Sequence, residues 1–168
     1  MIGQHAPTSE VERLAAQIAR LEERVADLQR ARVAPEFTYT PSLTATSVNP
    51  NVGSTAVRDG QYQVVDGRCR GRATVYAQGS GIAAGTGSYR VSLPVPVRYL
   101  PNTSITPIGY GLLYIGNPAA GMHPVALDAT PSTTTARILG EGFEAGSSLA
   151  GGFGAAGNCL WIAFDYPI

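Results

Sequence analysis

The chain has 168 residues, with 12 acidic and 12 basic side chains and a formal net charge of zero. This length allows one helical segment and one domain of ordinary size, and the balanced charge excludes the strongly basic surface typical of nucleic-acid-binding proteins. No stretch approaches the roughly 18 consecutive apolar residues of a membrane-spanning helix, and residues 1–8 lack the pattern of a signal peptide. We therefore expect no nucleic-acid partner and no membrane insertion.

Residues 9–34 have the periodicity of a coiled-coil helix. Apolar side chains recur in alternating steps of three and four residues, which makes a heptad seam with β-branched residues at position a and leucine at position d. The seam residues are Val11, Leu14, Ile18, Leu21, Val25 and Leu28. Ser9 and Glu12 have the spacing of a capping box, and Pro35 prevents the helix from continuing. Because the stripe is too narrow to pack on a large core, it predicts association with copies of the same chain.

The seam alone leaves the number of associated helices open. Isoleucine or valine at position a with leucine at position d favours a parallel dimer. Residues 17–22 and 24–29 each half-match a short motif of trimeric coiled coils, in which an arginine pairs with a glutamate of the neighbouring helix. Since about three heptads are marginally stable alone, we expect the rest of the chain to help hold the oligomer together.

From residue 43 onward the sequence is typical of an antiparallel β domain. Short alternating segments are separated by turn-forming residues roughly every 8–12 positions, and no second helical pattern appears. The expected strands are 43–48, 61–65, 68–77, 88–93, 105–115, 124–128, 133–139 and 158–167. The Asp-Gly pairs at 59–60 and 66–67 predict two hairpin turns. The predicted fold class is therefore mainly β, an antiparallel β-sandwich or jelly-roll head that follows an N-terminal coiled-coil helix.

These patterns divide the chain into four predicted segments. They are an N-terminal docking peptide at 1–8, a coiled-coil stalk at 9–34, a linker at 35–42 and the β head at 43–168. Phe37 and Tyr39 in the linker are expected to pack under the head. Two cysteines are too few for a disulfide scaffold. Cys69 and Cys159 could be buried free thiols or a single bridge between strands, and both interpretations stay open here.

Two motifs follow each other in the first part of the head. Gly60-Gln61-Tyr62 begins the first, and residues 85–94 form the second, with the pattern G-T-G-x-Y-x-x-S-L-P. Over residues 42–97 this arrangement resembles the heads of actinobacteriophage minor tail and fibre-type proteins. The resemblance implies a trimeric β-sandwich on a fibrous stalk. It therefore favours a homotrimer at the virion surface. Residues 1–8 could be disordered, or they could dock the stalk onto phage capsid or tail proteins.

Three arginines form the first candidate binding site. Arg68, Arg70 and Arg72 alternate along a predicted strand, so all three should lie on one face, with Cys69 and Ala73 turned inward. This face could bind an anionic polymer of the host cell surface or an acidic patch on a neighbouring virion protein. The alternative is an ordinary solvated face, which is the default for antiparallel strands.

Aromatic residues supply the second group of candidates. The glycine-rich loop at 140–157 carries Phe143, Leu149 and Phe153, and such loops either recognise partners or pack over the end of a domain. Tyrosine rings can stack on sugar rings. The tyrosines considered for this role are Tyr76, Tyr89, Tyr110 and Tyr114.

Together with the stalk and the β head, this resemblance implies a structural bacteriophage virion protein, for which we expect no enzymatic activity, metal or cofactor. It would be a trimeric surface spike that serves as a minor tail or fibre component, with possible binding to a host cell-surface glycan. A capsid decoration protein is the alternative. A glycan depolymerase is the third interpretation. Such an enzyme needs two carboxylates that face each other across a cleft. The acids of the head are Asp59, Asp66, Asp128, Glu141, Glu144 and Asp165, of which Glu141 and Glu144 form the candidate pair.

Overall fold

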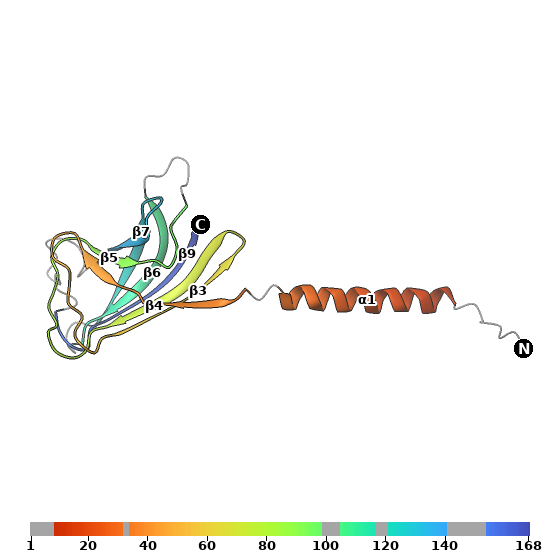
Figure 1. Cartoon of the computed structure of the whole chain (residues 1–168), viewed down its shortest axis with the longest axis horizontal. Helices are drawn as coiled ribbons and strands as arrows, with labels where there is room; N and C mark the ends of the chain where they lie inside the picture. Colours follow the sequence, from red (N-terminus) through yellow and green to blue (C-terminus); the bar gives the residue numbers. More distant parts are fainter. Residues whose placement is uncertain (1–8, 32–33, 99–104, 117–120, 141–153) are drawn as a thin grey trace, which may run out of the picture. The chain divides into compact units, whose positions relative to one another are not determined.

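The computed structural model describes residues 9–31, 34–98, 105–116, 121–140 and 154–168. The chain divides into two compact units, with the boundary between Ala34 and Pro35. The first unit contains the helix α1 (Glu10–Ala31), and the second contains an antiparallel sheet of nine strands (Figure 1). The described part of the chain is therefore mainly β with one helix, as the sequence predicts.

Helix α1 begins with the expected capping box. The Glu12 N–H donates to the Ser9 hydroxyl at 3.3 Å, and the Ser9 N–H donates to the Glu12 carboxylate at 3.0 Å. These bonds satisfy two donors that a helix start leaves unpaired. The seam is exposed in the single chain, with exposed fractions of 74% for Val11, 54% for Leu14, 55% for Ile18, 60% for Leu21 and 51% for Val25. The side chain of Leu28 lies outside the described residues.

The second unit is built from one continuous sheet. Its strands are β1 (Glu36–Tyr39), β2 (Leu43–Ala45), β3 (Val57–Val65), β4 (Arg68–Tyr76), β5 (Tyr89–Ser92), β6 (Thr106–Tyr114), β7 (Met122–Ala129), β8 (Thr135–Leu139) and β9 (Cys159–Pro167). Their order across the sheet is β1-β3-β4-β9-β6-β7-β8-β5-β2. Every neighbouring pair is antiparallel.

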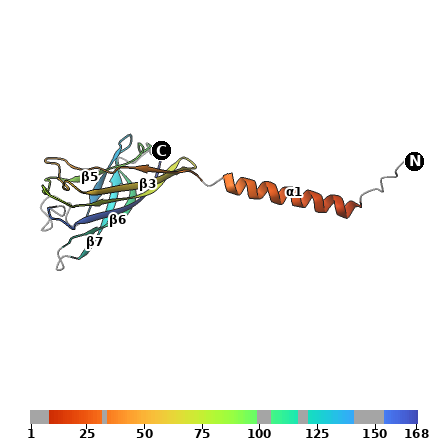
Figure 2. The ribbon, with the colours of Figure 1, turned by 60° about the horizontal axis from the view of Figure 1, so that its bottom comes forward.

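The sheet is strongly curled. β1 and β2 stand at opposite ends of the strand order, yet only residues 40–42 separate them in the chain. The four Cα steps from Tyr39 to Leu43 span at most about 14 Å, so the two ends of the sheet must lie close together. The Ser92 N–H donates to the Ser42 carbonyl at 2.9 Å, which ties this crossing to β5. The strands consequently wrap around one interior (Figure 2).

The inner face of the sheet forms the core. Leu160, Ile162, Phe164 and Tyr166 alternate along β9 and are each at most 4% exposed. The alternation of apolar residues along this strand therefore marks its inward face. It also leaves Trp161, Ala163 and Asp165 on the outer face, because successive side chains of a strand point to opposite sides.

One of the two predicted hairpin turns is correct. Asp66 and Gly67 have positive φ values of 49° and 70° and join β3 to β4. The turn predicted at 59–60 is wrong, because both residues lie inside β3, where Gly60 pairs with Tyr39 on one side and with Ala73 on the other. A Cβ on Gly60 would collide with the Tyr39 ring. Here the glycine provides space for a ring rather than a turn.

The stretch predicted as a linker contributes to the sheet. Residues 36–39 form β1 and pair with β3 over four positions. Tyr39 packs against the core, whereas Phe37 is 45% exposed and lies beside Tyr62, with 5.4 Å between the ring centroids. The extended connector is therefore the first strand of the sheet.

The two cysteines are free thiols. Cys69 is buried opposite Tyr166, and the half-buried Cys159 lies opposite Tyr76 at the other end of the same ladder. Seven strand positions correspond to about 23 Å, which is too far for a disulfide. Burial raises the pKa of both thiols. The bridge considered from the sequence is therefore excluded.

Candidate functional site

The three candidate arginines share the outer face of β4. Arg70 and Arg72 are exposed and Arg68 is half-buried, whereas Cys69, between Arg68 and Arg70, and Ala73, directly after Arg72, are buried. The alternation predicted from the sequence is confirmed. The side chains next to the arginines come from the two strands beside β4, which are β3 and β9.

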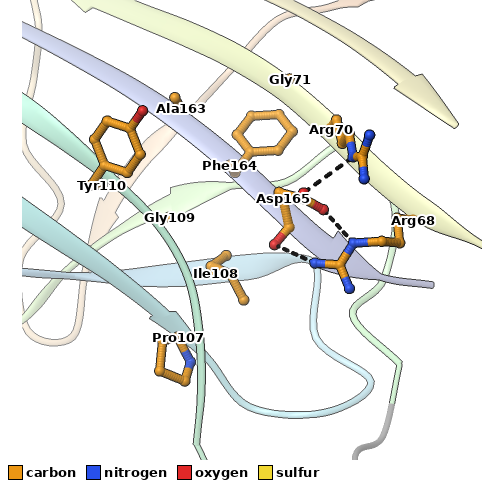
Figure 3. A pocket seen from close by; sticks show the side chains of 10 residues that line it. All are labelled: Arg68, Arg70, Gly71, Pro107, Ile108, Gly109, Tyr110, Ala163, Phe164 and Asp165. Atoms are coloured by element: carbon orange, nitrogen blue, oxygen red, sulfur yellow. Dashed lines mark hydrogen bonds and ion pairs between the residues drawn. The ribbon is translucent and has the colours of Figure 1, made fainter. Parts of the chain in front are cut away.

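Asp165 on β9 holds two of these arginines. Arg68 Nε donates to Asp165 Oδ1 at 2.5 Å, and Arg70 Nε donates to Asp165 Oδ2 at 3.1 Å (Figure 3). Arg68 Nη2 also donates to the Asp165 carbonyl at 3.2 Å. These side chains are 41–57% exposed, so water weakens the ion pairs and they contribute little to stability. Their effect is to fix the direction of both guanidinium groups.

Arg72 is held from the other side. Its Nε and Nη2 atoms donate to Gln61 Oε1 on β3, at 3.0 and 2.5 Å. Arg72 and Gln61 are direct cross-strand partners, as are Arg70 and Asp165. The arginine face is therefore an ordered array rather than a set of freely moving side chains. It carries three positive charges and the single negative charge of Asp165.

A groove of about 670 Å³ lies next to this array. It is lined by Arg68, Arg70, Gly71, Pro107, Ile108, Gly109, Tyr110, Ala163, Phe164 and Asp165 (Figure 3). The groove lies where the pairing of β6 with β9 ends at Gly109, and the pairing of β6 with β7 has a register irregularity between Pro107 and Gly109 at the same place. A Cβ on Gly109 would collide with the Ala163 carbonyl, so glycine permits the close approach at this point.

A second groove of about 410 Å³ lies on the other side of Arg70. It is lined by Glu36, Gln61, Tyr62, Gln63, Arg70, Gly71, Arg72, Trp161 and Ala163. Arg70 thus lines two grooves that each combine charged groups with aromatic rings, and the second groove adds the amides of Gln61 and Gln63. Such side chains can contact the hydroxyl and carboxyl groups of a sugar as well as its apolar face.

The four candidate tyrosines differ in accessibility. Tyr110 is 66% exposed and Tyr114 is 46% exposed, whereas Tyr76 is half-buried. The prediction for Tyr89 is wrong, because it points into the core and is only 2% exposed. Its hydroxyl donates to the Gly85 carbonyl at 3.2 Å, and burial raises its pKa.

Several other candidates lie outside this site. Phe143, Leu149 and Phe153, together with Glu141 and Glu144, fall outside the described residues. Asp128 on β7 is paired with Arg137, which donates to its two oxygens at 3.1 and 2.6 Å. Among the residues that the structure describes, no three metal-ligating side chains come together.

From the sequence, Asp165 was considered only as one of the acids of the head, and Trp161 was not considered. Asp165 and Trp161 both lie on the outer face of β9. The inward alternation of Leu160, Ile162 and Phe164 was a usable signal, because it assigns the residues between them to the opposite face. The residues that lie beside that face could not be predicted from the sequence, because they depend on the pairing of β9 with β4 and β6.

Comparisons with protein-family models, curated proteins and solved structures find no match to this chain. In the described part of the chain, no helix combines the length and the apolar content needed to cross a lipid bilayer. A functional proposal therefore rests on the exposed seam of α1, the arginine array and the grooves beside it.

Proposed function

We propose that this chain is a non-enzymatic structural protein of a bacteriophage particle. Its α1 helices associate as a homotrimeric coiled coil, and each chain presents a β head at the virion surface as a minor tail or fibre component. The head has a jelly-roll architecture in this proposal, with the crossing from β1 to β2 connecting its two sides. Residues 1–8 dock the trimer onto capsid or tail proteins, and the arginine array contacts a host glycan.

The exposed seam of α1 is the observation that carries the proposal. Five apolar side chains in heptad spacing are each more than half exposed. A monomer gains nothing from such a stripe, whereas each copy in a coiled coil inserts these side chains between those of its neighbours. The seam explains self-association, and the resemblance of residues 42–97 to phage heads favours three copies and a virion location.

The arginine array supports a contact with an acidic saccharide. Arg70 uses its Nε for Asp165, and the structure gives its Nη atoms no partner among the described residues. A guanidinium edge of this kind matches the two oxygens of a carboxylate. Three heads on one stalk would raise the avidity of individually weak contacts.

Arg70→Ala should weaken binding of polygalacturonate, a polymer of uronic acid, by about tenfold or more, because a charged hydrogen bond contributes about 1.5–3 kcal/mol. Calorimetric titration of the full chain measures this change. Arg58→Ala is the matched control, since it removes the same charge from an exposed residue of β3 that lines neither groove. Equal loss in both variants, or equal binding of neutral dextran by the native protein, would contradict recognition at Arg70.

Electron cryomicroscopy of particles tests the virion assignment. The proposal expects a few trimers at the tail. Copies at capsid three-fold positions would instead favour the alternative function, a capsid decoration protein. Absence of the chain from purified particles, measured by mass spectrometry of their proteins, would overturn both.

A further inference from the structure

The outer face of β9, β6 and β7 exposes a cluster of large apolar side chains. The cluster consists of Tyr110, Leu112, Tyr114, Met122 and Trp161, with exposed fractions of 66%, 40%, 46%, 68% and 38%. Cross-strand pairing makes it continuous, because Leu112 lies opposite Trp161 and Tyr114 lies opposite Met122. We call this cluster the outer apolar face.

The outer apolar face contains no charged side chain. The residues in register with it are Ala126 and Ala163 opposite Tyr110, Pro124 opposite Leu112, Cys159 opposite Tyr114 and Thr74 opposite Trp161, all of them uncharged. Arg72 lies opposite Ala163 on β4 and marks the edge of the face on that side. Contiguous apolar patches of a few hundred Å² are the largest that monomeric proteins usually expose, and such patches are often interaction sites. A face of uncharged residues can meet an identical face without bringing like charges together, which a charged face cannot do.

We propose that the outer apolar face is the contact between heads of the same oligomer, so that each copy covers it with the corresponding face of another. This inference rests on the proposed self-association through α1 and assigns the second interface of that assembly. In a cyclic trimer, the three faces would turn toward the common axis and meet there.

The exposed area of the outer apolar face is consistent with a contact between heads that forms only when the α1 helices hold the heads together. If each large side chain offers roughly 200 Å², the exposed fractions give on the order of 500 Å² per head. A standard interface buries about 800 Å² per partner, so the heads alone should associate weakly. Connection through α1 raises their effective concentration to about the millimolar range, and a modest apolar contact is then sufficient. The coiled coil and the head contact would therefore stabilise each other.

Trp161 provides the test, because it is the only tryptophan of the chain and belongs to the outer apolar face. Acrylamide quenching of its fluorescence is compared between the full native chain and the full-length variant Ile18→Glu/Leu21→Glu, which disrupts the seam. The oligomer should show quenching several-fold weaker than the variant, together with emission at shorter wavelength. The oligomeric state of both samples is measured in parallel by sedimentation.

The outcomes separate this inference from the proposed function. Equal quenching of an oligomeric native chain and a monomeric variant would overturn the head contact while leaving the helical association intact. A monomeric native chain would overturn both. Shielding of Trp161 in the monomeric variant by polygalacturonate, to the level seen in the oligomer, would overturn the head contact in favour of a glycan-stacking surface.

A second variant tests the face without changing α1. Leu112→Arg places a charge at a position that is 40% exposed, so the fold should be retained, and the oligomer should dissociate at concentrations several-fold higher than the native chain. Val57→Arg, at a 50% exposed position of β3, is the control and should dissociate like the native chain. Identical dissociation of the two variants would contradict the proposal.

Discussion

Replacing Ile18 and Leu21 together by glutamate should convert the oligomer into monomers of 17.5 kDa. The two residues occupy neighbouring a and d positions and are 55% and 60% exposed in the single chain. Association would bury a charge from each of these positions in every copy, and burying an unpaired charge costs several kcal/mol. About three heptads have too little stability to offset such a cost. Sedimentation velocity at micromolar concentration measures the result.

The control introduces a charge on the same helix away from the seam. Ala16→Glu lies at heptad position f and is exposed, so the oligomer should persist. Both changes use a residue with good helix propensity, and loss of the helix therefore cannot explain a difference between them. An Ile18→Glu/Leu21→Glu protein that sediments like the native chain would show that the seam is not the contact.

Phe164→Ala should destabilise the head by about 3–5 kcal/mol, the usual cost of removing a buried phenylalanine ring. Phe164 is 4% exposed, and its ring centroid lies 5.7 Å from that of Tyr166 and 6.3 Å from that of Tyr39. Urea unfolding followed by circular dichroism, in the Ile18→Glu/Leu21→Glu background, measures the free energy without a contribution from association. The control Val57→Ala removes exposed apolar atoms and should change it by about 0.5 kcal/mol or less.

The same ring explains the glycine at the centre of the arginine strand. A Cβ on Gly71 would collide with the Phe164 ring and with the Gln61 carbonyl. Gly71→Ala alone should therefore be costly, and part of that cost should disappear when Phe164 is already alanine. A double-mutant cycle measures this coupling. Strict additivity of the two substitutions would contradict the packing of the ring against Gly71.

The features that could be predicted from the sequence are those encoded locally. The capping box of Ser9 and Glu12 involves residues three positions apart, and both of its hydrogen bonds form. The inward face of β9 follows from simple alternation. The turn predicted at 59–60 failed because the partner that explains Gly60 is Tyr39, and the pairing of β1 with β3 leaves no local mark in the sequence.

Within the candidate site, too, locally encoded features could be predicted and long-range contacts could not. Alternation along one strand was sufficient to place Arg68, Arg70 and Arg72 together. Their anchor, Asp165, lies 95 to 97 residues away, and no spacing rule connects it to them. Tyr89 was misjudged although its strand carries a usable signal, because the apolar residues Tyr89 and Val91 alternate with Arg90 and Ser92 and are the two that are buried. Local alternation therefore decided which side chains share a face, whereas long-range pairing decided which residues lie beside them.

The mass of the full native chain in solution tests the central claim most directly. Native mass spectrometry at about 10 µM should give about 52 kDa, which corresponds to three copies of the 17.5 kDa chain. A mass of two copies would retain self-association through α1 but contradict the trimer that the resemblance to phage heads favours. A single species of 17.5 kDa would contradict the account, because neither the seam of α1 nor the outer apolar face would then have a partner.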